Sequence, residues 1–482
     1  MTPLEKARQY EREHQSSPES QPAFHVSPPV GWMNDPNGFS RFGGTNHLFF
    51  QYHPYSLEWG PMHWGHVVSD DLVVWKRRPA ALAPDQPWDK DGCFSGSAVE
   101  IPEGHLLVYT AVRKDEQGER QSQAFALGDG TNYTKLEQPL ITGEQLPEGF
   151  SRQDFRDPKI WLAADGWHLA AGSRTEENTG QIVHFTSPDR RHWTYAGLLA
   201  RAENGFGTMW ECPDVFELDG KDLLICSPQN IASTSLKFHN GHNAVWLTRG
   251  KGEAMFASEN PEPLDYGLDF YAPQTMELPD GRRVLIGWMA SWQAPVKAPG
   301  QVWLSQMTLP RELSFRNGRL IQKPIRELDN WVKTRLETTL DIEAPLEAEG
   351  VAGRYGRLQL DFEKPLTTAF AIDFAVDAAR RTTFLVDPFR DVLVMDRTFS
   401  GMDQDYQSIR QIPMPEGGVQ KIDAVLDLHS IEIFINEGEM VLSTSIPTPY
   451  DCEGIRFQAA DKVRAELCFE VYDTEAMRKE AA

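Results

Sequence analysis

Three short segments of this 482-residue chain place a carboxylic acid beside proline and aromatic or polar neighbours: WMNDPNG (32–38), FRDPK (155–159) and WECPD (210–214). Their acids are Asp35, Asp157 and Glu211. Each segment alone is typical of a surface turn or an ion pair. Together, two carboxyl groups can break a glycosidic bond, because one protonates the departing oxygen while the other attacks the sugar or activates water. That chemistry requires a fold that gathers the three segments.

A repeat of about 60 residues between residues 30 and 310 could gather them. Short apolar runs broken by Gly, Asp and Pro are typical of strands and turns. Hairpin-like turns, each with an apolar run after it, centre on glycines that can take the positive φ of a tight turn: Gly44, Gly104, Gly166, Gly220 and Gly281. A second marker of similar spacing is an Asp four residues before an aromatic residue: Asp71 and Trp75, Asp129 and Tyr133, Asp189 and Trp193.

Units of about four strands repeated around an axis form a β-propeller, so five units predict five blades. After Gly353 strands return without the repeat, and RLQLDF and IEIFI alternate as half-buried antiparallel strands do. We therefore predict an all-β chain, a five-bladed β-propeller followed by a C-terminal β-sandwich. The predicted divisions are an N-terminal extension (1–25), the propeller (26–325), a linker of helical or irregular character (326–345) and the sandwich (346–475).

The three acids share a place in this repeat. Asp35, Asp157 and Glu211 each lie nine residues before a turn glycine. The innermost strands of a propeller surround its axis, so equivalent positions of different blades should converge there. Carboxylates brought together repel one another, which favours a catalytic or cation-binding role over a stabilising one. The same offset gives Ser95 and Ala272 as neutral neighbours in the second and fifth blades.

Composition excludes several classes of protein. With 47 Lys and Arg against 70 Asp and Glu, the net charge is −23, which argues against a nucleic-acid partner. No apolar run reaches the roughly 18 residues of a membrane span. The first residues lack the apolar core of a secretory signal, and the cysteines form no CxxC pair, so we expect a cytoplasmic protein with reduced thiols: Cys93, Cys212, Cys226, Cys452 and Cys468.

Acids accompanied by tryptophans and amides favour a sugar site, because aromatic rings stack on sugar faces and amides or Arg bind hydroxyl groups. The candidate contacts are Trp32, Asn34, Gln51, Trp59, Phe94, Arg156, Trp288 and Trp292. Calcium is a rival use of the acids, but no EF-hand spacing is present. Zinc is disfavoured because the histidines lack an HExxH pattern: His53, His63 and His66.

The same segments resemble glycoside hydrolase family 32, the invertase and β-fructofuranosidase family. WMNDPNG, FRDPK and WECPD are similar to its three acidic motifs. Further similar stretches are WGHVVSDDLVVW (64–75), CFSGSA (93–98), LDFYAPQT (268–275), MTLPREL (307–313) and IEIFINEGE (431–439). The resemblance is dense over about residues 25–330 and implies the same propeller and sandwich.

The resemblance also implies roles. Asp35 would be the nucleophile, Asp157 the transition-state stabiliser and Glu211 the acid/base. Family binding residues would fall on Asn34, Gln51, Trp59, Phe94, Ser95, Arg156 and one of Trp288 and Trp292. The implied reaction is double displacement with retention, which predicts Asp35 and Glu211 carboxyls about 5–5.5 Å apart and a raised pKa at Glu211. No metal or organic cofactor is required.

Other functions stay open at this point. They are an inverting propeller glycosidase, a fructan exo-hydrolase, a fructosyltransferase that uses a sugar as acceptor, and a non-catalytic sugar-binding propeller. The substrate could be sucrose, sucrose 6-phosphate or a short fructo-oligosaccharide. A phosphate pocket would need basic residues such as Arg77, Arg78, Lys237 or Arg311. The sequence predicts no oligomeric state.

Overall fold

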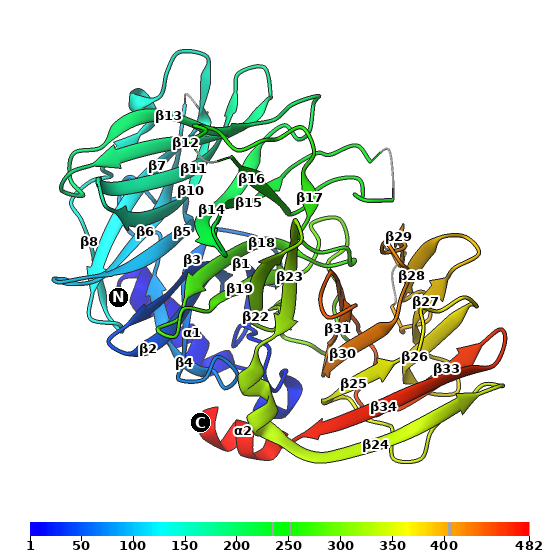
Figure 1. The fold of residues 1–482 in the computed structure, drawn as a ribbon. Helices are drawn as coiled ribbons and strands as arrows, with labels where there is room; N and C mark the ends of the chain where they lie inside the picture. Colours follow the sequence, from blue (N-terminus) through cyan, green and yellow to red (C-terminus); the bar gives the residue numbers. More distant parts are fainter. Residues whose placement is uncertain (117, 234–235, 251, 403–406, 482) are drawn as a thin grey trace.

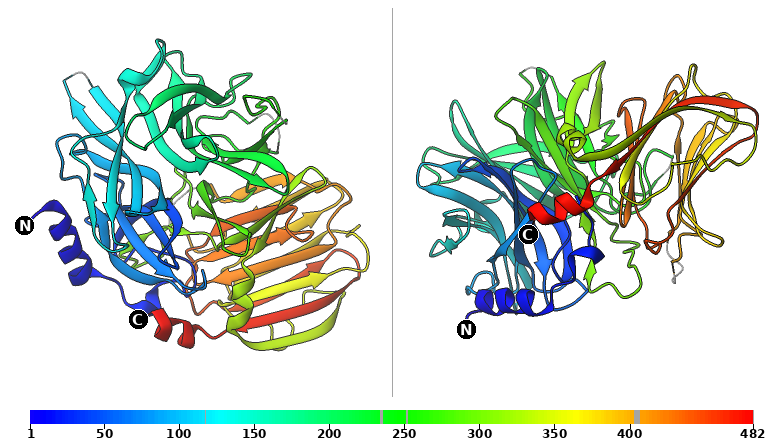
Figure 2. Two further views of the ribbon diagram at one scale, coloured as in Figure 1. Left: turned by 60° about the vertical axis from the view of Figure 1, so that its left-hand side comes forward. Right: turned by 90° about the horizontal axis from the view of Figure 1, so that it is seen from below.

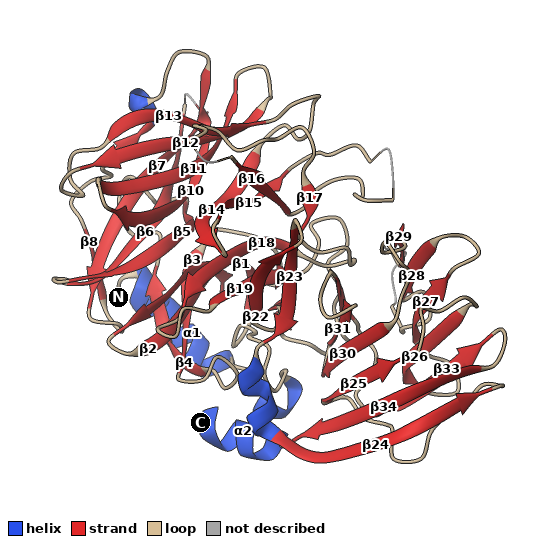
Figure 3. Cartoon of the chain, viewed as in Figure 1, coloured by secondary structure: helices blue, strands red, loops and turns tan. Residues whose placement is uncertain are grey.

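The computed structural model of the protein describes residues 1–116, 118–233, 236–250, 252–402 and 407–481. Strands dominate it (Figure 3). Five sheets of mainly antiparallel strands come first along the chain, and two further sheets follow at the other side of the molecule (Figure 1). The predicted fold class is confirmed: a five-bladed β-propeller precedes a β-sandwich.

Each propeller sheet is built mainly from consecutive strands. The first holds β1 (Gly31–Phe42), β2 (Thr45–His53), β3 (His63–Ser69), β4 (Lys76–Leu82) and, beside β1, β20 (Trp303–Leu304). The second holds β5 (Gly92–Ile101), β6 (Gly104–Asp115), β7 (Gly118–Gly128), β8 (Tyr133–Lys135) and β9 (Ile141–Thr142). The third holds β10 (Phe150–Ala163), β11 (Gly166–Thr175), β12 (Gly180–Ser187) and β13 (Thr194–Arg201).

The remaining two blades follow the same plan. The fourth holds β14 (Trp210–Leu218), β15 (Lys221–Pro228), β16 (Val245–Arg249) and β17 (Glu262–Pro263). The fifth holds β18 (Tyr271–Glu277), β19 (Arg283–Met289), β21 (Gln306–Met307), β22 (Arg311–Arg316) and β23 (Arg319–Pro324). Short 3₁₀ turns lie at η1 (Pro18–Ser20), η2 (Gly143–Gln145) and η3 (Arg326–Trp331).

Both predicted markers of the repeat are confirmed. Every turn glycine lies at the connection between the first and second strands of its sheet and has a positive φ, for example +86° at Gly44 and +75° at Gly220. The Asp of the second marker folds the turn before an outer strand. Asp71 Oδ1, for instance, accepts the backbone N–H groups of Val73 and Val74 at 2.9 and 2.8 Å.

The first strands of the five sheets, β1, β5, β10, β14 and β18, contact one another in a closed ring. The ring is completed where β20, which precedes β22 of the last blade, pairs in parallel with β1. Aromatic residues fill the wedges between blades, as the tryptophan and phenylalanine content suggests. Phe49, Trp64 and Tyr109, for example, share one buried cluster between the first and second sheets.

The sandwich packs two sheets over one core. One sheet has the order β24 (Val332–Ile342), β34 (Val463–Tyr472), β25 (Gly356–Asp361), β30 (Lys421–Asp427), β31 (Ser430–Ile435) and β32 (Met440–Ser445). The other has the order β29 (Ile409–Pro413), β28 (Val392–Asp396), β27 (Thr382–Asp387), β26 (Phe370–Val376) and β33 (Gly454–Ala459). Phe374, Phe384, Ile433 and Phe457 lie in the core between them.

The predicted linker over 326–345 is wrong for most of its length. Residues Val332–Ile342 form β24, an edge strand that pairs with β34 along its whole length. Most of its side chains are exposed or half-buried, because β24 has a neighbour on one edge only, so the apolar alternation that would have revealed it is weak.

Two helices flank the propeller and were not predicted. Helix α1 (Pro3–His14) begins with a capping box, in which Thr2 and Glu5 each accept the other's backbone N–H. Helix α2 (Thr474–Ala481) returns from the sandwich and lies beside the chain's first segment (Figure 2). None of the helices in the described part of the chain combines the length and apolar character of a membrane span.

A buried ionic network joins propeller and sandwich. His25 contacts Asp427 and Glu432 at 2.8 Å each, and Arg311 pairs with Glu432 and, at 3.0 Å, with Asp265. All of these side chains are inaccessible. The Arg311 guanidinium is therefore buried in ion pairs at this interface, and its suggested role in a phosphate pocket is wrong.

Candidate active site

A backbone irregularity recurs in the inner strands and places the acids. The pairing of each first strand shifts register around the same short stretch, which contains Asp35, Ser95, Asp157, Cys212 and Ala272. In four of the five strands proline follows that residue, and a proline cannot donate a ladder hydrogen bond, so a bulge forms there.

The bulge carries strained backbone. Asp157, Cys212 and Ala272 have φ of +63°, +48° and +50°, a left-handed region that such residues seldom adopt. Strain of this kind persists where the surrounding structure enforces it, and it concentrates at functional sites. Here it accompanies the convergence of side chains from different blades, because Cys212 Sγ contacts both Asp35 and Asp157.

The predicted equivalence of the three acids is wrong by one residue in the fourth blade. Cys212, not Glu211, occupies the place of Asp35 and Asp157, because each precedes the proline of its bulge. Counting from the turn glycine misled the alignment, since Gly220 lies within its turn whereas Gly166 is already the first residue of β11. Glu211 instead corresponds to Arg156.

The structure nevertheless brings the three acids together. Cys212 links the first two, because its Sγ lies 3.5 Å from Asp35 Oδ2 and 3.6 Å from Asp157 Oδ2, and its backbone N–H donates to Asp157 Oδ2 at 3.0 Å. The charge of Glu211 acts directly on both carboxyls. Asp35 and Asp157 are buried, and the Glu211 side chain is 13% exposed.

Asp35 is held by a chain of polar side chains that the sequence had marked as sugar contacts. Ser95 Oγ donates to Asp35 Oδ2 at 2.5 Å, and Gln51 Nε2 donates to Ser95 Oγ at 2.5 Å. On the other oxygen, Asn34 Nδ2 donates to Asp35 Oδ1 at 3.1 Å. Trp32 Nε1 in turn donates to Asn34 Oδ1 at 2.7 Å. These bonds fix the direction in which Asp35 presents its carboxyl.

Glu211 has a different partner on each oxygen, and a hydrogen bond with Gln229 also stabilises its carboxylate. Arg156 Nε donates to Glu211 Oε1 at 2.8 Å, and the Tyr271 hydroxyl lies 2.7 Å from Glu211 Oε2. The same hydroxyl lies 2.9 Å from the Ser227 carbonyl oxygen. A phenol has a single hydrogen, so Tyr271 can donate to only one of these acceptors at a time.

The surroundings separate the pKa values of the acids. Burial, together with the Glu211 charge, raises the pKa of Asp35, and the same two causes raise the pKa of Asp157 to about 8 against the opposing Arg156 charge. Burial would also raise the pKa of Glu211, but the Arg156 charge and the Tyr271 hydrogen bond outweigh it, so that pKa lies below its usual range. The predicted rise in the pKa of Glu211 is therefore wrong, since its partners lower that pKa instead.

The aromatic candidates divide into accessible and buried groups. Trp59 is 43% exposed and meets the half-buried Phe94 edge-on with ring centres 5.6 Å apart. Trp292 is 36% exposed and lies beside Trp32, with ring centres 5.8 Å apart and ring planes tilted by 32°. Trp288 is 0% exposed and donates its Nε1–H to Ser305 Oγ at 2.8 Å, so it supports the wall from behind and its suggested contact with substrate is wrong.

One metal ion could be spanned by the side-chain atoms of Asp35, Asp157 and Cys212, which lie within 4.8 Å of one another. Burial and the neighbouring carboxylates, however, raise the pKa of the Cys212 thiol well above its ordinary value. The Cys212 thiol can donate to Asp35 Oδ2 or to Asp157 Oδ2, so the three groups form a hydrogen-bonded trio in this structure.

Family comparison agrees with this geometry. The model of the "Glycosyl hydrolases family 32 N-terminal domain" matches residues 25–324, and that of the "Glycosyl hydrolases family 32 C terminal" matches residues 325–473. The chain belongs to glycosyl hydrolase family 32. It is thus a glycoside hydrolase, and the suspected resemblance is confirmed.

Relatives of this family 32 chain cover most of its length. A sucrose-6-phosphate hydrolase of Escherichia coli is 37% identical over 447 residues, which are 90% of each chain. A raffinose invertase of Escherichia coli is 35% identical, with 91% of this chain and 92% of the relative covered. Among solved structures, a Bombyx mori GH32 beta-fructofuranosidase is 30% identical and covers 98% of both chains with a TM-score of 0.84.

Sequence reasoning missed three features of this family 32 site. Tyr271 precedes a proline bulge at the place that Arg156 and Glu211 hold in their blades, so the pattern YAP beside RDP and ECP was a usable signal. Cys212 carried the same signal within ECP. Beneath the acids, Lys159 Nζ donates to Asp214 Oδ2 at 2.9 Å and ties neighbouring blades together, a pairing that no local pattern announces.

Proposed function

We propose that this protein is a β-fructofuranosidase that hydrolyses the terminal non-reducing β-D-fructofuranoside bond of sucrose or sucrose 6-phosphate with retention of configuration. The observation that carries the proposal is that Asp35, Asp157 and Glu211 come together from three blades. The Cys212 thiol contacts the two aspartates, and Arg156 donates to Glu211. The names of the relatives, sucrose-6-phosphate hydrolase and raffinose invertase, favour the same class of substrate.

In the first step Asp35 attacks C2 of the fructosyl unit. The bond from C2 to the glycosidic oxygen breaks, and Glu211 delivers its proton to that oxygen, so the aglycone leaves as a neutral alcohol. Ser95 and Asn34 hold the two oxygens of Asp35 in place. Because their hydrogen bonds stabilise the ionised form, they oppose the effect of burial and keep the nucleophile available.

In the second step water attacks C2 of the fructosyl ester. Glu211, now ionised, takes the proton of the water, and the bond between C2 and the Asp35 oxygen breaks. Two successive displacements at the same carbon restore its configuration. The geometric requirement is the predicted Asp35–Glu211 carboxyl separation of about 5–5.5 Å.

Tyr271 suits Glu211 to both steps. When Glu211 is ionised, the Tyr271 hydroxyl donates to Oε2. When Glu211 is protonated, its own O–H can donate to the Tyr271 oxygen while the Tyr271 hydrogen turns to the Ser227 carbonyl, 2.9 Å away. Glu211 then keeps a hydrogen bond with Tyr271 in both protonation states, which lets the proton come and go at low cost.

Asp157 stabilises the oxocarbenium-like transition state through hydrogen bonds to fructose hydroxyl groups. Gln51 is a second sugar contact, since its Oε1 is buried without a partner among the described residues and can accept a hydroxyl hydrogen. Trp59, Phe94 and Trp292 supply apolar faces beside the acids. Arg156 orients Glu211 through its hydrogen bond to Oε1, and it can also donate to sugar hydroxyl groups.

Three further assignments belong to this proposal. The catalytic unit corresponds to the propeller over about residues 26–325 and the supporting sandwich to about 346–475, with β24 now added to the sandwich. The protein works in the cytoplasm, because all five cysteines are unpaired thiols, as in reducing compartments. Neither a metal nor an organic cofactor takes part in the steps above.

The proposal is tested by turnover of pure enzyme on sucrose, sucrose 6-phosphate, 1-kestose and inulin, with product analysis. We expect fructose release from one of the first two substrates to exceed that from inulin, and water to be the main acceptor. Dominant transfer to a second sugar would instead identify a fructosyltransferase, and preference for inulin a fructan exo-hydrolase. An Asp35→Asn protein that keeps full turnover would refute catalysis by these acids.

A further inference from the structure

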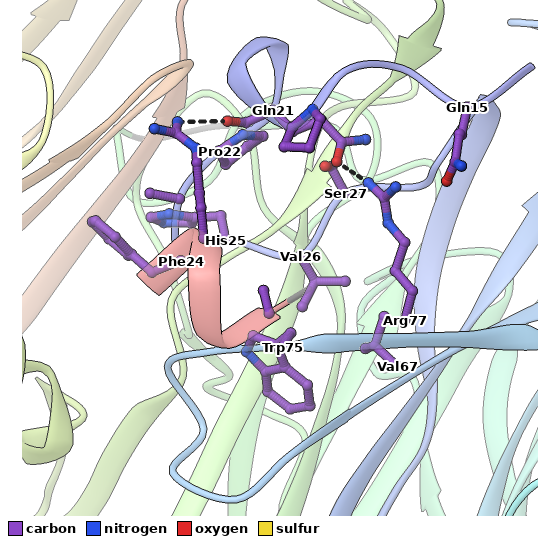
Figure 4. A pocket seen from close by; sticks show the side chains of 14 residues that line it. Gln15, Gln21, Pro22, Phe24, His25, Val26, Ser27, Val67, Trp75 and Arg77 are labelled. Carbon is purple, nitrogen blue, oxygen red and sulfur yellow. Dashed lines mark hydrogen bonds between the residues drawn. The ribbon is translucent and has the colours of Figure 1, made fainter. Parts of the chain in front are cut away.

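A second cavity, of about 310 Å³, lies apart from the carboxylate site, between the segment that follows α1, the first blade and helix α2 (Figure 4). Its floor is apolar and buried, formed by Phe24, Val26 and Val67. Gln15 and Pro18 are exposed and mark its mouth. Gln21, Trp75, Arg77 and Arg478 line its polar side, and His25 lies at its edge toward the sandwich.

The polar wall of this cavity offers hydrogen-bond donors that lack acceptors. Trp75 Nε1 and Arg478 Nε are buried and have no partner among the described residues. Both are N–H donors, and no lining residue has a comparable orphaned acceptor in that part of the chain. Buried polar groups are normally paired, so this wall is built for a ligand that brings acceptors.

Two arginines extend the donor surface. Arg77 makes one hydrogen bond among the described residues, to the Gln21 side chain, and a guanidinium has five N–H groups. Arg478 donates to Tyr355 Oη at 3.0 Å and to the Gln21 carbonyl at 3.5 Å. No lining residue is an Asp or Glu, in a chain of net charge −23.

The nearby charges leave these arginines available. The positive charge of His25 is already matched by Asp427 and Glu432 behind the floor. Glu11 lies close enough to act on Arg77, and the exposed Glu19 close enough to act on Arg478, but neither lines the cavity. An arginine fork matches the oxygens of a phosphate group, and the Trp75 ring and apolar floor suit the carbon face of a small ring.

We propose that this cavity binds a phosphorylated monosaccharide, with the phosphate toward Arg77, Arg478 and the Trp75 N–H and the sugar over the apolar floor. Its volume is at the lower end of the range for small-molecule sites, which suits one sugar ring and not a nucleotide. The bound ligand bridges the first segment, β4 and α2. The proposal goes beyond the proposed fructosidase function and stands independently of it.

Titration calorimetry tests this with three probes: glucose 6-phosphate, glucose and inorganic phosphate. Wild type should bind glucose 6-phosphate, and the affinity should fall by about tenfold or more in Trp75→Phe, which keeps an apolar ring but deletes the N–H, and in Arg478→Gln. Trp88→Phe, a half-buried tryptophan outside the cavity, is the matched control and should bind as wild type does. Sucrose turnover and thermal unfolding of each variant report whether it is folded.

Several outcomes would overturn the proposal. Unchanged affinity in folded Trp75→Phe and Arg478→Gln would show that the cavity is not the site. Loss of binding in Asp35→Asn instead would place the sugar phosphate among the catalytic carboxyls. Glucose or inorganic phosphate binding as tightly as glucose 6-phosphate would refute the ligand class.

Discussion

Replacing Tyr271 with phenylalanine should move the pH dependence of catalysis in a direction that the geometry fixes. Tyr271 donates to Glu211 Oε2 at 2.7 Å, and this bond is one of the causes that hold the pKa of Glu211 below its usual range. Removing the hydroxyl destabilises only the ionised carboxylate, so the pKa of Glu211 must rise. The general acid has to be protonated to act. The activity of Tyr271→Phe should therefore start to fall at a higher pH than the activity of wild type.

The size of the shift follows from the type of bond. A hydrogen bond to a charged group contributes about 1.5–3 kcal/mol, and one pKa unit corresponds to about 1.4 kcal/mol. The alkaline limb of kcat/KM should therefore move upward by about one to two pH units. The value of kcat at the optimum should fall as well, because the protonated carboxyl loses the acceptor that Tyr271 offers.

The assay is a full pH profile of kcat/KM for sucrose in wild type and Tyr271→Phe. Tyr195→Phe, a tyrosine of β13 distant in the fold from the acids, serves as control and should reproduce the wild-type profile. An alkaline limb that stays in place or moves to lower pH in Tyr271→Phe would refute the assignment of Glu211 as the acid, the role of Tyr271, or both.

Three other predictions address stability and chemistry. The pKa of His25 is raised to about 9 because its two carboxylate partners outweigh burial. The protonated ring therefore contributes about 3 kcal/mol to the free energy of unfolding, fully below pH 6.5 and progressively less as the pH rises toward 9. Urea unfolding of His25→Gln should lack this pH dependence. Glu211→Gln should slow sucrose hydrolysis by about 10²–10⁴-fold but slow the first-turnover release of p-nitrophenolate from p-nitrophenyl β-D-fructofuranoside far less, since nitrophenolate leaves without a proton. Equal losses in the first turnover would contradict the acid role. Lys159→Met leaves Asp214 buried without its counter-charge and should lower stability by about 3–5 kcal/mol, visible as a large drop in Tm.

The blade order was predictable because it depends on local chemistry. A tight turn needs a residue that tolerates positive φ, so the turn glycines mark the hairpins wherever they fall, and Gly44 and Gly220 do so in the structure. The register within a strand was not predictable in the same way. The turn glycine does not hold the same position in every hairpin, and counting back from Gly220 therefore gave Glu211 the place that belongs to Cys212.

Residue type also did not distinguish side chains that can contact a substrate from side chains that only support the fold. Trp288 and Trp292 are four residues apart and chemically identical, yet one is fully buried and the other lies open, because β19 ends between them. Arg311 has the composition of a phosphate ligand but is committed to carboxylates more than 40 positions away along the chain. Such pairings arise from the packing of propeller against sandwich, which a single sequence does not reveal.

The central claim is that Asp35 forms a covalent bond to the fructosyl unit, and one measurement tests it most directly. Glu211→Ala lacks the base for the second step, so its reaction with p-nitrophenyl β-D-fructofuranoside should accumulate the fructosyl ester. After rapid acid quenching, peptide mass spectrometry should find the mass of one anhydrofructose unit added to the peptide that contains Asp35. A fructosyl adduct on a different residue, or released nitrophenol with no adduct at any time, would contradict the account.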